Sequence, residues 1–589
     1  MRIRWLSLAC LLLTVSGVQA RDRLYLDASL DAETRTISGY ASFDIRDKGT
    51  ELTDLRLRLY PNIGCIDNDS CGVQIDSLIV NGVDVTERIS ADGTDLYVSF
   101  EDAVSPARSL EVTAWFTTHI STSDDRLFCV QNRYLLTGWF PMLAPWQEGQ
   151  WRRVFYRDFL EPAADLLDIE ASISFPNSLE LMAPGVEAVD TAEDRTTARL
   201  ALEASSGLPL FLAQGYQQDS TVVRGAALKI YYRETDLFCL DTVRNAAEAA
   251  LNFMSNYVFL YPHDELIIVI GGLKRGGGLE QPRMILASTP PRTAFSRLYA
   301  AMITHEVVHQ WFYGVVNSNQ AEAPWLDEAV TEYLGLKIGH YRAGGEPDLI
   351  DVFGLTGDHL TLNRMNARSV METDPITRPG DEFYNQSVYY RTVYSKGTSI
   401  LQTIGALMGE GNEQAFWKEY AETFMYSNPQ PEDFVRLANR YLPQSKGADV
   451  RTILDLTTNT DFAIVSLNAE AAEIPDSQAT ASEDNPGWNV SVEYLAQHPL
   501  GFPVELRIEL VDGTVIDTVV NPGPGRHRIE YATTSPALAA IIDPDYKYAV
   551  DGDYLNNSLV TKRSVGAAMR LFSGVTFLVE SLFSSLWGW

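Results

Sequence analysis

His-Glu-Val-Val-His at residues 305–309 is followed, with eighteen residues between its second histidine and the glutamate, by Trp-Leu-Asp-Glu at residues 325–328. If residues 305–309 are helical, His305 and His309 lie one turn apart on the same face, because positions i and i+4 are neighbours on a helix surface. Their imidazoles can then meet the carboxylate of Glu328 at one point. Two neutral imidazoles and one carboxylate are a ligand set of catalytic zinc, which keeps its fourth position open for water. The pattern therefore predicts one zinc ion per chain, held by these three side chains.

Glu306 follows the first histidine of this pattern directly. Its carboxylate can face a water molecule at the open position of the metal and act as a general base. Such a string can also arise by chance from two core histidines and a surface glutamate. The layout favours the metal site, because a plausible helix carries both histidines and the next helix supplies a carboxylate. The sequence therefore predicts an enzyme.

Helical patterns surround the motif. A proline pair at 290–291 interrupts the chain, and residues 293–313 then read as one helix that stops at Gly314. Residues 324–340 read as a second helix beside it. Further helical patterns cover residues 242–257, 393–407 and 431–442.

The chain of 589 residues is too long for a single hydrophobic core. Residues 21–218 alternate apolar with polar side chains over short runs, which predicts an N-terminal β domain. Residues 219–455 mix buried-strand runs with helical patterns and contain the metal motif. Residues 456–560 return to short strands and predict a small C-terminal β-sandwich. The expected fold class is multidomain α+β.

The two ends of the chain differ from the rest in composition. Residues 1–20 combine early arginines, an apolar run and Val-Gln-Ala before Arg21, which is the layout of a secretory signal peptide. We therefore expect an exported protein, periplasmic or extracellular. Residues 561–589 predict a C-terminal amphipathic helix, since their leucines gather on one helical face. This helix could dock on a neighbouring domain, or residues 565–589 could lie along a membrane surface, and both interpretations stay open.

The formal net charge of the chain is −32. Such an acidic protein repels nucleic acid, so we expect no nucleic-acid partner. Cys65 and Cys71 lie close enough in sequence to close a small disulfide loop if the protein folds outside the cytosol.

The metal motif, with its spacing of eighteen residues to the third ligand, resembles that of the aminopeptidase N family of gluzincin zinc peptidases. Two further stretches are similar to family motifs in order and distance. Residues 277–281 read Gly-Gly-Leu-Glu-Gln and resemble the family's Gly-x-Met-Glu-Asn, with leucine and glutamine in place of methionine and asparagine. Residues 394–397 read Tyr-Ser-Lys-Gly and resemble the family's Tyr-x-Lys-Gly.

The resemblance implies a thermolysin-like catalytic domain and a zinc aminopeptidase that acts on peptides with a free N-terminus. Glu306 would polarise the attacking water, and Tyr394 would hydrogen-bond the developing oxyanion. Glu280 would pair with the α-ammonium group of the substrate. Gly277 and Gly278 would let the backbone approach the ligand closely. Glutamine at position 281 changes the family's contact at that point.

The sequence is also compatible with three other functions. The same zinc site could serve an endopeptidase or a non-peptide hydrolase, or it could belong to a non-catalytic scaffold.

Two further residues near the motifs have open roles. Glu332 could be a partner for a ligand histidine or a plain exposed glutamate, and Tyr389 could line the cleft. Larger family members carry a long α-superhelical domain after the catalytic unit. Here the remaining length is spent on a small β domain, so we expect a more open cleft.

Overall fold

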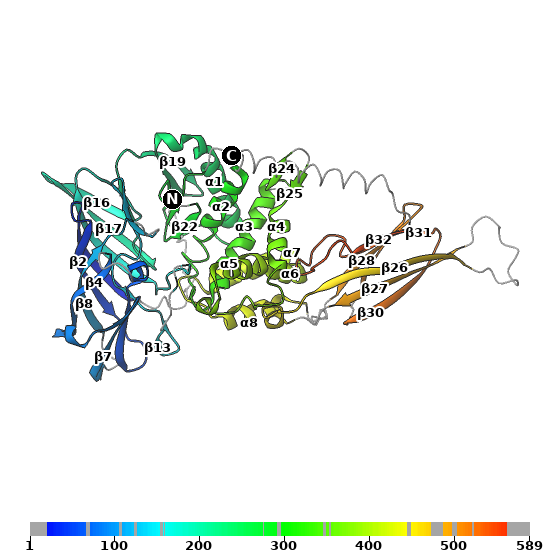
Figure 1. Ribbon diagram of the computed structural model, residues 1–589, viewed down its shortest axis with the longest axis horizontal. Coiled ribbons are helices and arrows are strands. Elements are labelled where there is room, and N and C mark those ends of the chain that lie inside the picture. The colour runs from blue at the N-terminus through cyan, green and yellow to red at the C-terminus, as the bar shows by residue number, and fades with distance from the viewer. Residues whose placement is uncertain are drawn as a thin grey trace, which may run out of the picture.

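Figure 1 shows the computed structural model, which describes residues 21–561 apart from short internal segments. Those segments are residues 66–70, 105–108, 123–125, 153–156, 158, 275, 291–295, 345–348, 353–354, 444–448, 473–486, 498–502 and 521–522. The predicted signal peptide and the predicted C-terminal helix lie outside the described residues. Three parts follow one another along the long axis of the molecule: a β-rich part, a helical part and a second β part. The fold is thus multidomain α+β, while the predicted domain boundaries stay predictions.

The N-terminal part is built of antiparallel strands with one parallel pair. Its largest sheet has eight strands in the order β16-β17-β14-β1-β2-β8-β4-β5, and two four-stranded sheets have the orders β15-β18-β10-β9 and β11-β3-β7-β6. In β1 (Arg23–Asp31) every second side chain is buried, as the alternation of its sequence requires. Trp139 and Phe140, in a connection between strands, lie in the same apolar core.

The strands of this part are β1 (Arg23–Asp31), β2 (Thr36–Ile45), β3 (Leu52–Arg58), β4 (Gly72–Val80), β5 (Val83–Asp84), β6 (Ser90–Asp92), β7 (Asp95–Val104), β8 (Leu110–His119), β9 (Leu127–Val130), β10 (Arg133–Leu136), β11 (Met142–Leu143), β12 (Trp146–Gln147), β13 (Gln150–Trp151), β14 (Leu167–Pro176), β15 (Glu180–Met182), β16 (Val186–Thr191), β17 (Arg195–Ser205) and β18 (Leu210–Ala213).

The middle part pairs a five-stranded sheet with a set of helices. The sheet has the order β19-β20-β21-β23-β22, so that β22 forms one edge. Its strands are β19 (Gln217–Val223), β20 (Ala226–Tyr232), β21 (Glu265–Ile270), β22 (Gly278–Gln281) and β23 (Met284–Ala287). The helical segments are η3 (Glu234–Cys239), α1 (Leu240–Tyr257), α2 (Ser296–Val308), η4 (Pro324–Leu326), α3 (Glu328–Arg342), α4 (His359–Arg368), η5 (Gly380–Glu382), α5 (Gln386–Tyr390), η6 (Arg391–Lys396), α6 (Gly397–Met408), α7 (Glu410–Thr423), α8 (Pro431–Tyr441) and α9 (Val450–Leu454).

The helix predicted for residues 293–313 ends earlier than expected, because α2 stops at Val308. The backbone then tightens, with Gln310 N–H donating to the Val307 carbonyl at 3.1 Å and Trp311 N–H to that of Val308 at 2.9 Å. Tyr313, with φ of 124°, cannot continue a helix. The turn directs the chain away from the helix axis immediately after the second histidine.

The C-terminal part holds two antiparallel sheets, β26-β27-β30 and β29-β28-β31-β32, whose inward side chains join the core of the helical part. Its strands are β26 (Asp461–Ala471), β27 (Trp488–Gln497), β28 (Val504–Leu510), β29 (Val515–Val520), β30 (Gly525–Thr533), β31 (Ala537–Ile542) and β32 (Ser558–Val560). Between residues 450 and 561, α9 is the single α-helix among the described residues. The described residues between 450 and 561 therefore contain no long helical domain.

Cys71 is disulfide-bonded, whereas Cys129 and Cys239 are free and buried. Among the helices of the described segments, none has the length and apolar character needed to cross a membrane.

Candidate metal centre and cleft

Helices α2 and α3 bring three metal-ligating side chains together. His305 is on α2, His309 lies in the first turn beyond its end, and Glu328 is the first residue of α3. The Nε2 atoms of the two histidines are 3.1 Å apart. Oε2 of Glu328 lies 3.3 Å from Nε2 of His305 and 3.4 Å from that of His309. The structure therefore assembles the three side chains that the sequence spacing singles out.

These distances fit a small tetrahedral metal ion. Zinc bonds to nitrogen and oxygen are about 2.0–2.1 Å long, so neighbouring corners of a regular tetrahedron around it lie about 3.3 Å apart. The observed edges of 3.1, 3.3 and 3.4 Å bracket that value. Oε2 of Glu328 is buried and makes no hydrogen bond, which is costly for a carboxylate oxygen unless a cation accompanies it. The donor set and its spacing thus suit a divalent metal.

A carboxylate behind each histidine fixes its ring. Nδ1 of His305 is 2.9 Å from Oε2 of Glu332, and Nδ1 of His309 is 2.8 Å from Oδ1 of Asp327. A ring that donates its Nδ1–H in this way presents the lone pair of Nε2 to a metal. Glu332 is therefore a partner of His305 and not a plain exposed glutamate. Asp327, which the sequence analysis gave no role, does the same for the second ring.

Helix α4 supports Glu332 from behind. Nε2 of His359 is 2.7 Å from Oε1 of Glu332, and Nδ2 of Asn363 donates to the same oxygen at 3.0 Å. Burial alone would raise the pKa of Glu332, but His359 and His305 beside it hold that pKa well below its usual range. Nothing local in the sequence of α4 marks either residue, since their role depends on tertiary packing.

Glu306 faces the start of β22. It is buried, its Oε2 atom has no hydrogen-bond partner, and burial raises its pKa to about 7. A Cβ at Gly278 would lie 2.4 Å from the Glu306 side chain, so only glycine lets the edge strand come this close. Gly277, with φ of 127°, occupies a backbone conformation that favours glycine. Both predicted glycines line the cleft.

Glu280 points into the same cleft from β22. It is 4% exposed, and its Oε1 atom has no hydrogen-bond partner. A carboxylate oxygen of Glu280 lies within 4.8 Å of the ligand atoms of Glu306 and His309. Burial, and then the neighbouring charge of Glu161, raise the pKa of Glu280 well above its usual range. The cleft therefore holds a buried carboxyl oxygen, Oε1 of Glu280, that has no cationic partner among the described residues.

Arg126 and Glu161 are site residues that sequence reasoning missed. Both line the cleft, and the guanidinium of Arg126 binds the carboxylate of Glu161 through two contacts of 2.5 Å. They come from connections in the β-rich part, more than a hundred residues before the metal motif. No motif or spacing in the sequence links them to it.

Tyr394 reaches the metal ligands from the π-helical segment η6, a distortion that often marks functional sites. Its ring lies nearly parallel to that of His305, with centroids 5.9 Å apart. Burial, and then the charge of Glu328, raise the pKa of Tyr394 well above its usual range, so its hydroxyl keeps its proton. Tyr389 is buried among Phe159 and Phe383 and does not line the cleft.

The lysine and glycine after Tyr394 hold η6 in place. Nζ of Lys396 is buried and donates to the carbonyl oxygens of Met371 and Asp374 at 2.9 and 2.6 Å. A Cβ at Gly397 would lie 2.5 Å from the Cβ of Ala329 on α3. Close packing of these two elements therefore sets the position of Tyr394 relative to Glu328.

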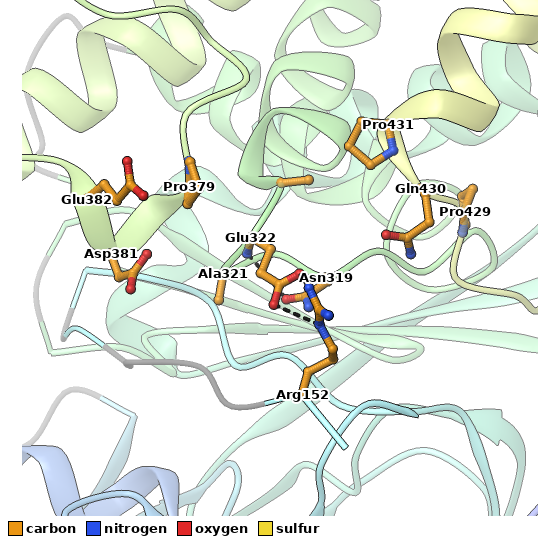
Figure 2. A pocket seen from close by; sticks show the side chains of 11 residues that line it. Arg152, Asn319, Ala321, Glu322, Pro379, Asp381, Glu382, Pro429, Gln430 and Pro431 are labelled. Atoms are coloured by element: carbon orange, nitrogen blue, oxygen red, sulfur yellow. Dashed lines mark hydrogen bonds and ion pairs between the residues drawn. The ribbon is translucent and has the colours of Figure 1, made fainter. Parts of the chain in front are cut away.

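All eight predicted site residues line one cleft of about 380 Å³. A separate cavity of about 400 Å³ opens where the β-rich part meets the helices. Figure 2 shows Arg152 reaching Glu322 there, with Pro379, Pro429 and Pro431 around it. None of the predicted site residues lies in that cavity, so we place the chemistry in the cleft.

The chain is similar to known proteins in sequence and in fold. Residues 245–456 match the peptidase family M1 domain. The chain is 29% identical to Aminopeptidase B of Mus musculus over 189 residues, which cover 30% of this chain and 27% of that protein. It is 24% identical to Glutamyl aminopeptidase of Bos taurus over 335 residues, which cover 52% of this chain and 34% of that protein. The matches thus span about a third or less of the length of these relatives.

Among solved structures, the fold is similar to that of Legionella pneumophila aminopeptidase A in complex with aspartic acid. The TM-score is 0.63 at 12% sequence identity, over 92% of this chain and 60% of that one.

Proposed function

Because this chain belongs to peptidase family M1, we propose that it is a zinc-dependent aminopeptidase that hydrolyses the N-terminal peptide bond of peptides. The metal would be held by His305, His309 and Glu328, one ion per chain. When bound there, zinc would polarise the scissile carbonyl and lower the pKa of the attacking water.

The observation that carries the proposal is the buried, unpartnered carboxylate oxygen of Glu280 beside the metal cluster. A free α-ammonium would supply the missing cation and several hydrogen bonds. An internal peptide bond carries no such charge, and its binding would leave this carboxylate buried without a partner. This asymmetry favours removal of N-terminal residues over cleavage within a chain.

Glu306 is placed to move the proton. Its Oε2 atom is buried without a partner in the cleft, and a pKa of about 7 lets the group accept and return a proton near neutral pH. It would accept a proton from the attacking water and deliver it to the nitrogen of the leaving amine. The absence of a side chain at Gly278 lets the edge strand lie directly against this carboxylate.

Tyr394 would stabilise the charge that develops on the carbonyl oxygen. Its raised pKa keeps the hydroxyl a donor at neutral pH, and a donor aimed at the developing oxyanion lowers the barrier. Strand β22, at the edge of its sheet, offers a backbone along which a peptide could lie.

An amino-acid arylamide and its N-acetylated form test the proposal. We expect the free amine to be cleaved at least about a hundredfold faster, because acetylation removes the charge that Glu280 would bind. Replacement of Glu280 by glutamine should lower the kcat/KM of the free arylamide and erase most of that preference. Glu187→Gln, at an exposed position of β16, is the matched control. Equal or faster hydrolysis of the acetylated compound would refute the role of Glu280.

We also propose that the protein is exported after removal of residues 1–20. The arginines, apolar run and small residues of that segment support this. N-terminal sequencing of protein purified from its source should begin near Arg21, and recovery of Met1 on the mature chain would oppose export.

A further inference from the structure

A groove of about 410 Å³ continues the cleft along α2. It shares Ala301 of α2 and His359 of α4 with the cleft that holds the metal ligands. From there it follows the seam between α2 and α3 as far as Arg297 and Arg342. A Cβ at Gly335 of α3 would lie 3.9 Å from the His305 backbone, so the two helices run close together here.

The described side chains that line the cleft and those that line the groove differ in charge. Five glutamates, with Arg126 as the one arginine, line the described part of the cleft: Glu161, Glu280, Glu306, Glu328 and Glu332. Arg297, Arg342 and His359 line the groove, and none of its described lining residues is an aspartate or a glutamate. This contrast arises within a chain whose formal net charge is −32. A molecule lying across both sites would be complementary if one end were positive and the other negative.

Contacts around β22 fix the direction in which a bound peptide would run. Nε2 of Gln310, beyond the C-terminal end of α2, donates to the Gln281 carbonyl at the far end of β22. At the other end, Ser288 N–H donates to the Gly277 carbonyl, and Tyr299 in the first turn of α2 donates to the Ser288 carbonyl. Strand β22 and helix α2 therefore run in the same direction, with Gly277 near the start of α2 and Gln281 beyond its end. A peptide with its ammonium at Glu280 that runs antiparallel to β22 would cross the metal site, pass Gly278 and Gly277, and continue toward the N-terminus of α2.

The distance along α2 sets the length of that peptide. Arg297 precedes His305 by eight positions, which is about 12 Å along the axis at about 1.5 Å per residue. An extended peptide covers about 3.3–3.6 Å per residue. Arg297 therefore lies about three to four residues beyond the scissile bond.

We propose that this groove binds the C-terminal carboxylate of the substrate, so that the protein prefers peptides of about four to five residues with a free carboxyl end. The inference rests on the proposed aminopeptidase function and specifies its substrate class. Each guanidinium has five N–H donors, so it can hold a neighbour and still bind a carboxylate through two of them. Arg297 and Arg342 would act as specificity-determining residues remote from the reacting atoms.

The test measures kcat/KM for peptides of two to eight residues, each as the free acid and as the C-terminal amide. Their N-terminal residue is the one cleaved best in an arylamide panel. We expect the free acid to be cleaved at least about tenfold faster than the amide at four to five residues, since charge-assisted hydrogen bonds have that scale. The ratio should approach one at eight residues, whose carboxylate lies beyond the groove.

The variant Arg297→Gln/Arg342→Gln should bring the acid-to-amide ratio at four to five residues close to one. Arg199→Gln, at an exposed arginine of β17, should leave the ratio as in the wild-type protein. Both peptides are measured with the same enzyme preparation, so partial misfolding of a variant cancels from the ratio. A ratio of one in the wild-type protein would overturn the inference, as would an unchanged ratio in the double variant.

Two further outcomes separate the inference from its premise. Hydrolysis of the simple arylamide reports the proposed function alone, because an arylamide is too short to reach Arg297. Cleavage of the arylamide together with an acid-to-amide ratio of one would refute the groove and keep the aminopeptidase; failure to cleave any arylamide would refute both. An amidated peptide with aspartate at its fourth or fifth position that equals the free acid would overturn the assignment to the terminal carboxylate.

Discussion

Glu306 and His309 are three residues apart in sequence, yet their side chains lie in different surroundings. His309 turns Nε2 toward the metal cluster and has its other ring nitrogen on Asp327. Glu306 contributes to the cleft but not to the cluster of His305, His309 and Glu328. Base chemistry and metal binding should therefore be separable by substitution.

The variant Glu306→Gln should keep about one zinc per chain and lose at least about a hundredfold in kcat, the scale of general-base removal. The variant His309→Gln should lose the metal, because two of the three ligands cannot hold it against competition from water. Atomic absorption and steady-state kinetics on the same samples check both outcomes. Equal loss of zinc in the two variants would show that the roles are wrongly assigned.

Among single residues, the sequence predicts those site residues whose neighbours in the site lie at a fixed helical spacing. His305 and His309 are four positions apart at the end of α2, and Glu328 begins α3, so helical spacing brings the two histidines together and the following helix supplies the carboxylate. Arg126 and Glu161 could not be predicted from the sequence, because the fold brings them to the cleft from loops of the β-rich part and no local sequence pattern records this contact. The role of Glu332 was one of two alternatives, and only the distance to His305 decides between them.

Among the elements, η6 and α3 depend on each other most directly. Gly397 begins α6 immediately after η6, and its hydrogen atom occupies space that a methyl group would share with Ala329. The closeness of the two elements places Tyr394 beside His305. A side chain at position 397 should therefore affect both stability and catalysis.

We predict that Gly397→Ala lowers the free energy of unfolding by about 1–3 kcal/mol, the usual effect of overpacking, and lowers kcat because Tyr394 shifts. Gly411→Ala on α7 is the control, since no atom lies within 4 Å of a Cβ there, and alanine should stabilise that helix by about 0.5–1 kcal/mol. Chemical denaturation and arylamide kinetics measure both. Equal stability and equal kcat in the two variants would contradict this view of η6.

Most helices and strands could be predicted from the sequence, because amphipathic periodicity and strand alternation are local patterns. Predicted helices at 242–257 and 431–442 correspond to α1 (Leu240–Tyr257) and α8 (Pro431–Tyr441). The early end of α2 could not be predicted, because it results from backbone turns after Val308 and from the conformation of Tyr313.

In the whole molecule, the C-terminal sheets are joined to the helical part through a buried acid, Asp551. The backbone carbonyl of Asp551 accepts a hydrogen bond from Arg364 of α4 at 3.3 Å. Its carboxylate accepts from Asn557 at 2.8 Å. Burial raises the pKa of Asp551 to about 7, although hydrogen bonds from Asn557 and Asp553 oppose the shift.

This raised pKa makes the stability of the molecule depend on pH in a defined direction. Between about pH 4 and pH 7 the folded protein keeps a proton on Asp551 that the unfolded chain has released, so this residue destabilises the fold increasingly as pH rises. The variant Asp551→Asn removes the effect. Its free energy of unfolding, relative to the wild-type protein, should rise between pH 4 and pH 8 by up to about 4 kcal/mol. Urea unfolding at both pH values checks this, with exposed Asp545→Asn as control; a difference that is constant with pH would contradict it.

Strands, and not a long helical domain, follow the helical part over the described residues up to 561. The expectation of a more open cleft rests on this arrangement. The composition of residues 456–560 predicted strands there, but the contact between Arg364 and Asp551 depends on packing that no local pattern encodes.

The central claim is that His305, His309 and Glu328 bind one zinc ion at the floor of the cleft. Anomalous diffraction from zinc-grown crystals, recorded on both sides of the zinc absorption edge, tests it most directly. We predict one strong peak about 2.0–2.1 Å from Nε2 of both histidines and from a carboxylate oxygen of Glu328. A zinc peak elsewhere, with none between these three side chains, would contradict the account.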